Sequence, residues 1–370
     1  MRIAHVLTYL SADGAFGGPV AVMTEQVTEL ARRGHHVEVF AGWDGRASFA
    51  PPHVVTHLFR TRTLVPGAGF SGLIAPGLVR ALRSRRAEFD VVHVHLARDL
   101  ITTPAAAALV GAGSPRVFVQ PHGMVKPDAR LRAKLFDRRT RRILSAADGA
   151  FALTDVDAAR LAAVEPSVRL RGLPNGVTVP PAGEERGGHP PEVLFLARLQ
   201  ARKRVLLFAE AAHRLLDDGV DAVFRVVGPD EGDLDALLAM TAAHPDRLVY
   251  EGPVPPGAGP GRIARADLYV LPSLNEPFPM SVLEALAAGT PTVISETCHI
   301  ADRLGSAVAT FADDDPAGAL TETLRGLLAD DAERDRLGRR GRDSVIERFS
   351  IAHVADLLEG YYSSEPLEQR

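Results

Sequence analysis

The sequence predicts an α/β protein built from two domains, each with a parallel β-sheet that is covered by helices on both faces. The first observation is that short runs rich in Val, Ile and Leu recur along all 370 residues. Their continuous apolar character is typical of strands that are buried on both faces. The second is that stretches with helical spacing, such as Val20–Arg33 and Arg204–Asp218, separate most of these runs. A strand–helix–strand repeat predicts parallel pairing, and the chain length suits two ordinary domains.

The predicted strands form two sets with a long aperiodic stretch between them. The first set comprises Arg2–Leu7, His36–Ala41, Val91–His95, Arg116–Val119 and Gly149–Leu153, and the second comprises Val193–Leu196, Val223–Val227, Leu248–Glu251, Leu268–Leu271 and Thr292–Ser295. Between them, Pro174–Pro191 contains five prolines and four glycines in eighteen residues, which indicates a linker. The predicted parts are a first domain over 1–175, a linker over 176–191, a second domain over 192–345 and a C-terminal helix and tail over 346–370.

The composition excludes several classes of protein. Apolar residues make up 46% of the chain and charged residues 24%, which is the balance of a globular protein and not of a disordered one. The net charge of −4 argues against a dedicated nucleic-acid binder. The single cysteine, Cys298, excludes an intramolecular disulfide and a metal cluster held by cysteines alone. No apolar run approaches the ~20 residues of a membrane helix, and the N-terminal strand lacks a signal-peptide layout, so we expect a cytoplasmic protein.

The charge is divided unequally between the two halves. Residues 1–176 carry 23 Lys and Arg against 14 Asp and Glu, a net charge of +9, whereas the remainder carries 19 against 32, a net charge of −13. The basic half is therefore the better candidate to meet an anionic partner or surface.

A proline-containing loop and the helix predicted after it carry two glutamates. Pro279 suits the first helical position, so Glu276 is expected in the loop and Glu284 about a turn and a half inside the helix. The free N–H groups of Met280 and Ser281 would then favour a negative group. A loop carboxylate can bind sugar hydroxyls and one on the helix can bind a diol such as a ribose. The alternative is a solvated glutamate before a surface helix, and the apolar neighbours of Glu284 argue against it.

Cations follow the first predicted strand of the second domain, in the sequence LARLQARKRV. Arg198 and Lys203 lie just past the carboxyl end of Val193–Leu196, where parallel sheets bind ligands. Two fixed cations there would neutralise a diphosphate without a metal. Arg202 and Arg204 are expected to be solvated neighbours. An ordinary basic helix start is the alternative interpretation.

Glycines and histidines follow strands of the first domain. Gly17 and Gly18 precede the predicted first helix, and glycine lets backbone N–H groups approach a ligand closely; a plain strand-to-helix turn is the alternative. The chain has neither GxGxxG at this point nor GxxxxGK[ST] anywhere, so a nicotinamide-cofactor site and a P-loop are not expected. His122 follows a strand, and His95 lies nearer a strand end than His93, so His122 and His95 are the better ligand candidates.

The acidic clusters fit helix caps and not a metal site. Asp313, Asp314 and Asp315 precede a helical stretch, and Asp155 and Asp157 stand at another helix start. Aspartate is a preferred capping residue. We therefore expect no metal ligand among the site residues and no cofactor.

Five motifs occur in a characteristic order. They are the opening GGPVAVMTEQVTELARRGHHVEVF, PHGM at Pro121–Met124, PNGV at Pro174–Val177, LARLQARKR, and the E-x7-E of Glu276 and Glu284. In this order they resemble the retaining, GT-B type nucleotide-sugar glycosyltransferases of the glycosyl transferases group 1 family (family 4), over nearly the whole chain. The resemblance implies two Rossmann-like doubly wound domains that face each other across a cleft. It also implies that a helix over Val345–Tyr362 crosses back to the first domain.

The resemblance assigns roles to individual residues. Glu276 would contact the donor sugar, Glu284 the ribose, and Arg198 and Lys203 the diphosphate, while His122 would position the sugar without a certain role in proton abstraction. The implied donor-binding residues are Gly17, Gly18, Arg198, Lys203, Gly252, Val254, Glu276, Phe278, Met280, Ser281 and Glu284; the implied catalytic residues are Glu276, His122, Arg198 and Lys203; the implied acceptor-side residues are His95, His122 and Asn175.

The chain departs from the family's pattern beside one of these residues. Pro277 and Pro279 flank Phe278, where the family usually has glycines. Because proline has no N–H group, any donor contact from those two positions is lost. Contacts from Met280 onward are unaffected.

A basic segment lies outside the predicted donor site. Lys126–Arg142 contains eight basic and two acidic residues, and Leu131, Leu135, Ile143 and Leu144 supply a narrow apolar stripe. One interpretation is a peripheral contact with an anionic membrane surface, at the inner membrane face, or with an acidic acceptor. The other, which the lack of Trp favours, is an outer helix whose stripe faces the core.

The expected activity is a metal-independent transfer of a sugar from a nucleoside-diphosphate sugar, with UDP preferred, to a hydroxyl acceptor with retention of configuration. A polysaccharide, a lipid-linked acceptor and a small secondary metabolite all remain open as acceptors. Two alternatives from other classes are a nucleotide-sugar 2-epimerase of the same fold, which has no reason for the E-x7-E spacing, and a catalytically inactive sugar-nucleotide-binding protein. No nucleic-acid partner is expected.

Overall fold

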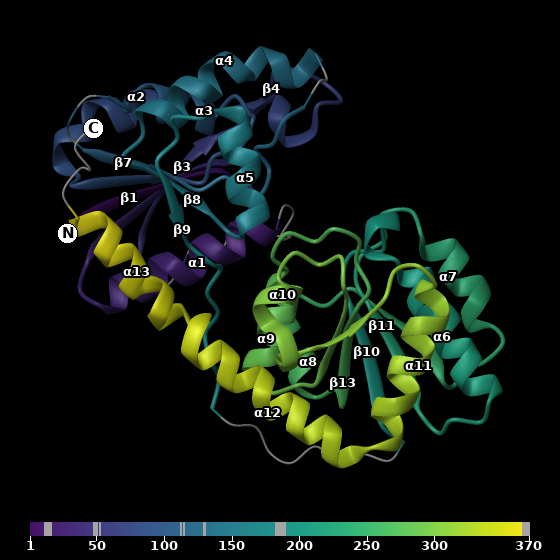
Figure 1. Cartoon of the computed structure of the whole chain (residues 1–370). Helices are drawn as coiled ribbons and strands as arrows, with labels where there is room; N and C mark the ends of the chain where they lie inside the picture. Colours follow the sequence, from purple (N-terminus) through teal and green to yellow (C-terminus); the bar gives the residue numbers. More distant parts are fainter. Residues whose placement is uncertain are drawn as a thin grey trace. The chain divides into compact units, whose positions relative to one another are not determined.

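The computed structural model describes residues 1–10, 17–46, 51, 53–111, 113, 115–128, 131–181 and 190–364. The chain folds into two compact units, which are seen in Figure 1. The first unit comprises Met1–Gly176 together with Ile351–Arg370, and the second comprises Val177–Ser350. The chain therefore passes from one unit to the other at Gly176 and returns at Ile351.

The first unit is built on a sheet of seven parallel strands in the order β3-β2-β1-β6-β7-β8-β9. The strands are β1 Arg2–Leu10, β2 His36–Trp43, β3 Val55–Arg60, β6 Val91–Val94, β7 Arg116–Val119, β8 Gly149–Ala152 and β9 Leu170–Gly172. A separate antiparallel pair consists of β4 Arg62–Thr63 and β5 Leu73–Ile74. Because all seven strands run the same way, the loops at their carboxyl ends gather at one edge of the sheet.

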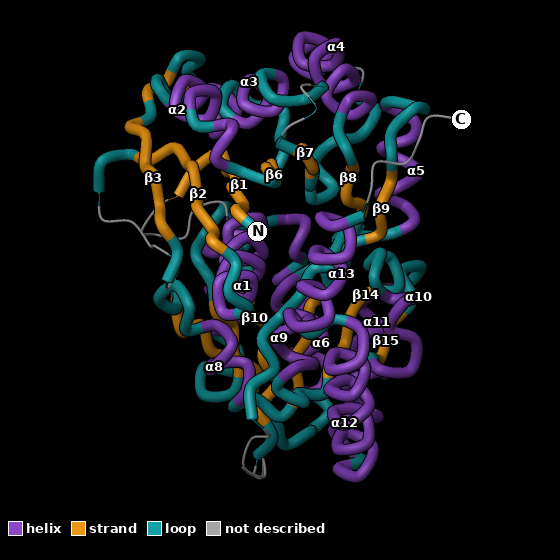
Figure 2. Tube along the Cα trace, turned by 90° about the vertical axis from the view of Figure 1, so that its left-hand side faces the viewer, coloured by secondary structure: helices purple, strands orange, loops and turns teal. Residues whose placement is uncertain are grey.

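Helices cover both faces of this sheet. The helices are α1 Gly17–Arg32, α2 Leu78–Ser84, α3 Thr102–Ala107, α4 Leu131–Ala146, α5 Asp155–Val164 and α13 Ile351–Ser363. Apolar residues of α1 and α13 pack together on one face, and α2, α3 and α4 contribute to the core on the other; Figure 2 shows the same separation. The C-terminal helix α13 is thus part of the core of the first unit.

The second unit has a sheet of six parallel strands in the order β12-β11-β10-β13-β14-β15. The strands are β10 Glu192–Leu196, β11 Val223–Val227, β12 Leu248–Gly252, β13 Leu268–Leu271, β14 Thr292–Ser295 and β15 Ala309–Phe311. The helices are α6 Val205–Asp217, α7 Leu234–Thr241, α8 Gly259–Ala264, α9 Met280–Ala287, α10 Ala301–Leu304, α11 Pro316–Ala329 and α12 Asp331–Arg348. Apolar residues of α6, α7 and α11 share a core with one face of the sheet, and α9 packs against α8 and α12 (Figure 1).

The predicted fold class is confirmed, and every predicted strand is present. The strands that sequence analysis missed are β3, β9 and β15, which close the ends of the two sheets, and the two-residue strands β4 and β5. Edge strands are covered less completely, and β3 accordingly has no buried residue and no continuous apolar run. The prediction of one continuous helix over Val345–Tyr362 is wrong, because the segment is divided at Phe349–Ser350 into α12 and α13.

One of the two predicted aspartate clusters supplies a helix cap. Asp315 accepts a hydrogen bond from the Gly318 N–H at 3.2 Å at the start of α11. At the start of α5 the cap is instead Thr154, whose Oγ1 accepts from the Asp157 N–H at 3.2 Å. Such bonds satisfy backbone donors that have no partner within the helix.

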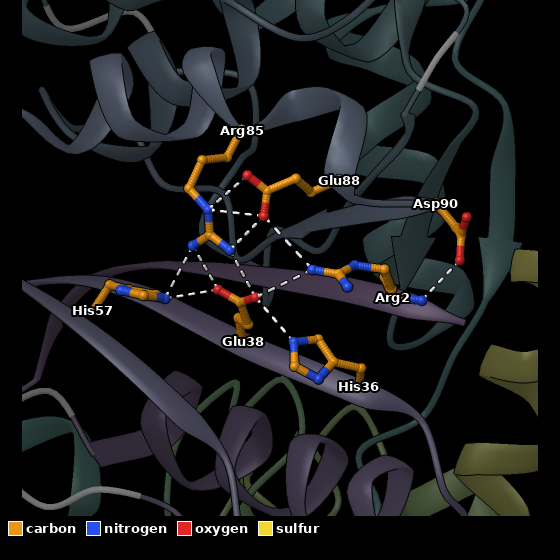
Figure 3. A network of polar contacts seen from close by, with 7 residues as sticks. All are labelled: Arg2, His36, Glu38, His57, Arg85, Glu88 and Asp90. Carbon is orange, nitrogen blue, oxygen red and sulfur yellow. Dashed lines mark hydrogen bonds and ion pairs between the residues drawn. The ribbon is translucent and has the colours of Figure 1, made fainter.

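A buried carboxylate joins three strands of the first unit to the segment after α2 (Figure 3). Glu38 is only 3% exposed, and Arg85 donates to both of its oxygens at 2.7 and 2.9 Å. Nε2 of His57 lies 2.6 Å from Oε2, Nε2 of His36 lies 3.0 Å from Oε1, and Arg2 approaches to 4.0 Å. Burial alone would raise the pKa of Glu38, but the hydrogen bonds from Arg85, His57 and His36 more than offset it and lower the pKa from 4.5 to about 2.

This network predicts an acid-sensitive contribution to stability. Because the folded pKa of Glu38 lies below its unfolded value, the contribution is fully present above about pH 5 and is lost as the pH falls toward about 2. Glu38→Gln should lower the free energy of unfolding by roughly 2–3 kcal/mol at pH 7, and the difference from the parent should shrink as the pH falls. Urea unfolding at a series of pH values measures it.

Glu88→Gln is the matched control, because Glu88 contacts the same Arg85 at 2.7 Å but is 44% exposed. Its cost should stay below about 1 kcal/mol. A Glu38→Gln variant that loses stability in parallel with the parent between pH 5 and pH 3 would contradict the assignment.

Candidate active site

The predicted residues of the second unit lie in two loops at the carboxyl ends of neighbouring strands. The loop after β10 leads through a short 3₁₀ turn, Ala201–Lys203, into α6, and the loop after β13 leads into α9. Because β10 and β13 pair in parallel, their loops meet, and the Leu274 N–H donates to the Arg202 carbonyl at 3.0 Å. Arg204 ends the turn in the left-handed conformation, with φ of 54°. This fold places the LARLQARKRV and NEPFP sequences against each other.

A lysine and a glutamate form the centre of this edge. Nζ of Lys203 donates to Oε2 of Glu276 at 2.7 Å, and the two side chains are only 12% and 11% exposed. Burial lowers the pKa of Lys203, and the Glu276 carboxylate opposes that shift. The pair is therefore a largely desolvated ion pair, in which each charge depends on the other.

Two arginines of the same loop were predicted to be solvated neighbours. Arg202 is 42% exposed, as predicted, whereas Arg204 is largely buried, and both make ion pairs. Nη1 of Arg202 lies 2.9 Å from Oε2 of Glu276, so this carboxylate contacts two cations. Arg204 is 14% exposed and donates to Asp313 at 2.6 Å and to the Pro272 carbonyl at 2.6 Å. Its role is to fix the loop that precedes Glu276, because Pro272 directly follows β13.

The backbone of Glu276 is held by the loop after β14. Its carbonyl accepts from the His299 N–H at 3.0 Å and from Sγ of Cys298 at 3.6 Å. The preceding Asn275 adopts φ of 48°, a conformation that asparagine tolerates better than most residues. Burial raises the pKa of the Cys298 thiol to about 12, so the chain's single cysteine is a neutral structural donor at pH 7.

Arg198 lies in the same loop but does not join this ion pair. It is 51% exposed, and its Nη1 contacts Oε1 of Glu231 at 2.8 Å. Sequence analysis did not single out Glu231, although it follows β11 at the same edge of the sheet, and that position was the available signal. The two predicted diphosphate cations thus have different surroundings, one buried against Glu276 and one exposed against Glu231.

The start of α9 presents polar groups beside this edge. Pro279 was predicted to be the first helical residue, but with ψ of 122° it precedes the helix, which begins at Met280. The first-turn N–H groups of Met280 and Ser281 lie where a helix favours negative charge. Oγ of Ser281 lies 2.8 Å from the hydroxyl of buried Tyr269, and the Glu284 carboxylate is near enough to help raise the pKa of that hydroxyl, after burial as the main cause.

Phe278 does not present its ring at this edge. Its side chain is 5% exposed and packs edge-on against Phe349 with ring centroids 5.8 Å apart. The ring therefore serves the core, and its predicted donor contact is restricted to backbone atoms.

The loop predicted to line the base pocket follows β12. Gly252 adopts φ of 82°, and its carbonyl accepts from the Gly228 N–H at 3.1 Å, while Val254 is half-buried. Gly228, with φ of 150°, directly follows β11, and a Cβ there would overlap the Ala197 carbonyl oxygen. Glycine at 228 is therefore required for the loops after β10, β11 and β12 to lie side by side.

In the first unit, the predicted glycines begin a helix. Gly17 and Gly18 were expected just before the first helix, and they are instead the first two residues of α1. A Cβ at Gly18 would meet nothing within 4 Å, so space alone does not demand glycine there. The preceding residues 11–16 of the predicted SADGAFGGP loop lie outside the described residues.

The predicted residues His95 and His122 form a hydrogen-bonded chain with His5, which sequence analysis did not single out. Nδ1 of His95 lies 2.8 Å from Nε2 of half-buried His122, and Nε2 of His95 lies 3.0 Å from Nδ1 of His5. His95 is 1% exposed and His5 is fully buried, so His95 meets His122 and not open space. Burial lowers the pKa of both His5 and His122 to about 3. The signal for His5 was its position on β1, directly opposite His93 on β6.

Asn175, the third predicted acceptor-side residue, is 4% exposed beside the first crossing between the units. The next residue, Gly176, packs against the start of α13, where a Cβ would lie 2.9 Å from Cγ2 of Val354. The site role of Asn175 stays a prediction.

The prediction that the site needs no metal also stays a prediction. One ring nitrogen from each of His5, His93 and His95 lies within 4.8 Å of the others. Both nitrogens of His95, however, are already hydrogen-bonded to neighbouring imidazoles. A metal at this point would have to displace those bonds.

The predicted basic segment contains helix α4, Leu131–Ala146. Ile143 and Leu144 are buried in the core, and Arg138, Arg139, Arg141 and Arg142 are exposed. Residues 129–130 and the side chains of 131–135, including Leu131 and Leu135, lie outside the described residues. Among the described residues, no helix is both long enough and apolar enough to cross a membrane. Contact of this segment with a membrane stays a prediction.

The comparisons with known proteins agree on one family. The model of the glycosyl transferases group 1 matches residues 181–344, and the model of glycosyltransferase family 4 matches residues 16–179. A D-inositol 3-phosphate glycosyltransferase from Xylanimonas cellulosilytica is 30% identical over 397 residues, 95% of this chain and 92% of the relative. A 2-deoxystreptamine glucosyltransferase from Streptomyces kanamyceticus is 29% identical over 330 residues, 80% of this chain and 84% of the relative. The solved structure of Anabaena HepE in complex with UDP-glucose has a TM-score of 0.71 at 16% identity, over 98% of this chain and 100% of the other.

Replacement of Gly228 tests the loop arrangement. Gly228→Ala should destabilise the second unit by about 3 kcal/mol, since it adds a clash with Ala197 to an unfavourable φ. Gly232→Ala is the matched control, because Gly232 also has positive φ, at 123°, but has nothing within 4 Å of its Cβ; its cost should be about 1 kcal/mol. Equal midpoints of urea unfolding for the two variants would contradict the requirement for close approach.

Proposed function

The chain belongs to the glycosyl transferases group 1 family, and on that premise we propose that it transfers a sugar from UDP-sugar to a hydroxyl group of a small acceptor. The proposal includes retention of anomeric configuration and independence of a metal ion. It places the donor on the second unit and the acceptor on the first.

The observation that carries the proposal is the pairing of Lys203 with Glu276 at the carboxyl edge of the second sheet. A buried ammonium and a guanidinium at this edge provide fixed positive charge for a diphosphate. The exposed guanidinium of Arg198 and the start of α9 add to it. Such an arrangement supplies without a metal the charge that a departing diphosphate requires.

The ion pairs of Glu276 support a second role, in binding the sugar. The Glu276 carboxylate is neutralised by Lys203 at 2.7 Å and Arg202 at 2.9 Å. A diphosphate competes with this carboxylate for both cations, and a carboxylate so released accepts hydrogen bonds from sugar hydroxyls. Glu284, on the next turn of α9, is the candidate for the ribose hydroxyls.

The proposed chemistry is electrostatic. The acceptor hydroxyl attacks the anomeric carbon on the side that the diphosphate leaves, which preserves configuration. The bond from the anomeric carbon to the diphosphate oxygen breaks, the bond to the acceptor oxygen forms, and the hydroxyl proton passes to the departing diphosphate. Preorganised cations stabilise the negative charge that develops on the leaving oxygen.

The choice of a small acceptor and of UDP follows the relatives. Two of them are named for 2-deoxystreptamine and D-inositol 3-phosphate, which are small polyhydroxylated molecules, and a similar fold binds UDP-glucose. The excess of basic residues over 1–176 suits an acceptor with a negative group. The names of these relatives do not favour the 2-epimerase or the inactive protein.

Activity of variants tests the proposal. Release of UDP from UDP-glucose, with a cyclitol or cyclitol phosphate as acceptor and EDTA present, should fall about 10²–10³-fold in kcat for Lys203→Met and for Glu276→Gln. UDP should also raise the unfolding temperature of the parent and raise that of Lys203→Met less, because a ligand of the folded state alone stabilises it.

Arg214→Met is the control, because Arg214 forms an exposed pair with Glu210 on α6, with both side chains 46% exposed. Its activity should equal that of the parent. Loss of activity in EDTA with recovery in Mg²⁺ or Mn²⁺, or equal activity in Lys203→Met and Arg214→Met, would refute the assignment. An epimer of the sugar formed without acceptor would show the isomerase instead.

A further inference from the structure

The hydrogen bonds among His5, His95 and His122 in the first unit limit which of their ring nitrogens can carry a proton. Along the chain, Nδ1 of His5 meets Nε2 of His95 at 3.0 Å, and Nδ1 of His95 meets Nε2 of His122 at 2.8 Å. The rings of His95 and His122 lie only 9° from parallel, with centroids 5.1 Å apart. Each contact joins two imidazole nitrogens, so each needs one N–H and one bare nitrogen.

These contacts leave only two arrangements of protons when all three rings are neutral. In the first, each histidine carries its proton on Nδ1, and His122 directs an N–H away from His95. In the second, each carries its proton on Nε2, and Nδ1 of His122 is bare. Burial lowers the pKa of all three side chains, which keeps the rings neutral at pH 7.

The surroundings of His5 distinguish the two arrangements. Nε2 of His5 is buried without a partner among the described residues. The side chain of Gln120 interacts with His93 and opposes the lowering of its pKa, and the rings of His5 and His93 lie 4.7 Å apart. Tyr362 lies with its hydroxyl 2.6 Å from Nδ1 of His93. Among the described residues that hydroxyl proton has no other acceptor, so Tyr362 donates to Nδ1 of His93 and the proton of His93 stays on Nε2. Burial raises the pKa of Tyr362, which keeps that proton on its oxygen.

With its proton on Nε2, His5 would therefore place an unpaired N–H beside the N–H of His93. Buried N–H groups without partners are the rarest kind of unsatisfied group. The arrangement with all protons on Nδ1 instead places a bare nitrogen of His5 beside the N–H of His93, which is the more favourable electrostatic pairing.

We propose that His95 and His5 are positioning residues that hold His122 in the Nδ1–H tautomer, so that His122 offers a hydrogen-bond donor, and not a base, to the bound sugar. His122 is the one member of the three that is half-buried and not fully buried. Its backbone stands in the left-handed region, with φ of 53°, in a turn closed by the Met124 N–H to the Pro121 carbonyl at 2.9 Å. The turn fixes the ring, and the two histidines behind it fix the proton. The proposal rests on the proposed function only for the identity of the ligand.

The direct test is the tautomer of each ring. Two-bond ¹H–¹⁵N correlation spectra of the full chain labelled with ¹⁵N in histidine, assigned with single-histidine variants, distinguish Nδ1–H, Nε2–H and the cation. The expected result at pH 7 is Nδ1–H for His5, His95 and His122, and Nε2–H for His93. Nε2–H on His122, or a His122 cation, would overturn the proposal whether or not the chain transfers a sugar.

Substitutions of His95 and His93 separate positioning from simple packing. His95→Phe should release the tautomer of His122 and lower kcat/KM about tenfold, the effect of about 1.4 kcal/mol in one hydrogen bond. His95→Asn should restore most of both, because its amide can donate to Nε2 of His122. His93→Phe is the matched control, since His93 lies two residues before His95, is equally buried and makes no hydrogen bond to His122. In this variant a proton on Nε2 of His5 would still be buried without an acceptor, so the Nδ1–H arrangement stays favoured.

His93→Phe should keep the Nδ1–H signal of His122 and kcat/KM within about twofold of the parent, even if its unfolding temperature falls as far as that of His95→Phe. Equal effects of the two variants on the His122 signal would overturn the proposal. So would one equivalent of zinc in the purified protein that is lost in His93→Phe, because a metal on these rings displaces the hydrogen-bonded chain. A normal tautomer pattern with no transfer activity would refute the proposed function alone.

Discussion

The parallel direction of every strand in the two main sheets is the constraint on which the candidate site depends. In a parallel sheet, each carboxyl end lies at the same edge, so segments far apart in sequence meet there. In the second unit this brings the loop after β10 against the loop after β13, and Lys203 reaches Glu276 across 73 residues of chain. In the first unit it brings His5 of β1, His95 after β6 and His122 after β7 into contact. Small groups at the crossing points, Gly228 above all, let the loops approach.

Charge at these edges is compensated within the protein before any ligand binds. The acidic second unit holds a buried Lys203, and its carboxylate partner is at the same time a candidate ligand for the sugar. Under the proposed function, Glu276 is paired with the cations until a diphosphate takes its place on them and releases the carboxylate. Arg198 has different surroundings. Its partner Glu231 is solvated, so this ion pair contributes little to stability. In the first unit, burial lowers the pKa of His5, His95 and His122 and keeps these three rings neutral at pH 7, so they interact through hydrogen bonds.

Sequence reasoning predicted the parts of the molecule that depend on local pattern. Strands such as Val223–Val227 and Leu268–Leu271 were placed to the residue, because buried parallel strands are continuous apolar runs. Sequence reasoning could not predict β3 or β15, because these strands are stabilised by pairing with a neighbouring strand and not by an apolar pattern of their own. The residues Glu276, Arg198 and His95 were found from the sequence, but their contacts with Arg202, Glu231 and His5 were not. Those partners are set by strand register and side-chain reach, as is the Glu38 network, and such pairings are properties of the folded chain.

The central claim is that a nucleoside diphosphate takes the place of Glu276 on Lys203. A crystal structure of the chain with UDP measures this directly, because the Lys203–Glu276 contact of 2.7 Å would have to open. The account predicts that Nζ of Lys203 lies within hydrogen-bond distance of a diphosphate oxygen, with the Glu276 carboxylate turned away from it. An unchanged Lys203–Glu276 contact, with the diphosphate bound elsewhere on the second unit, would contradict it.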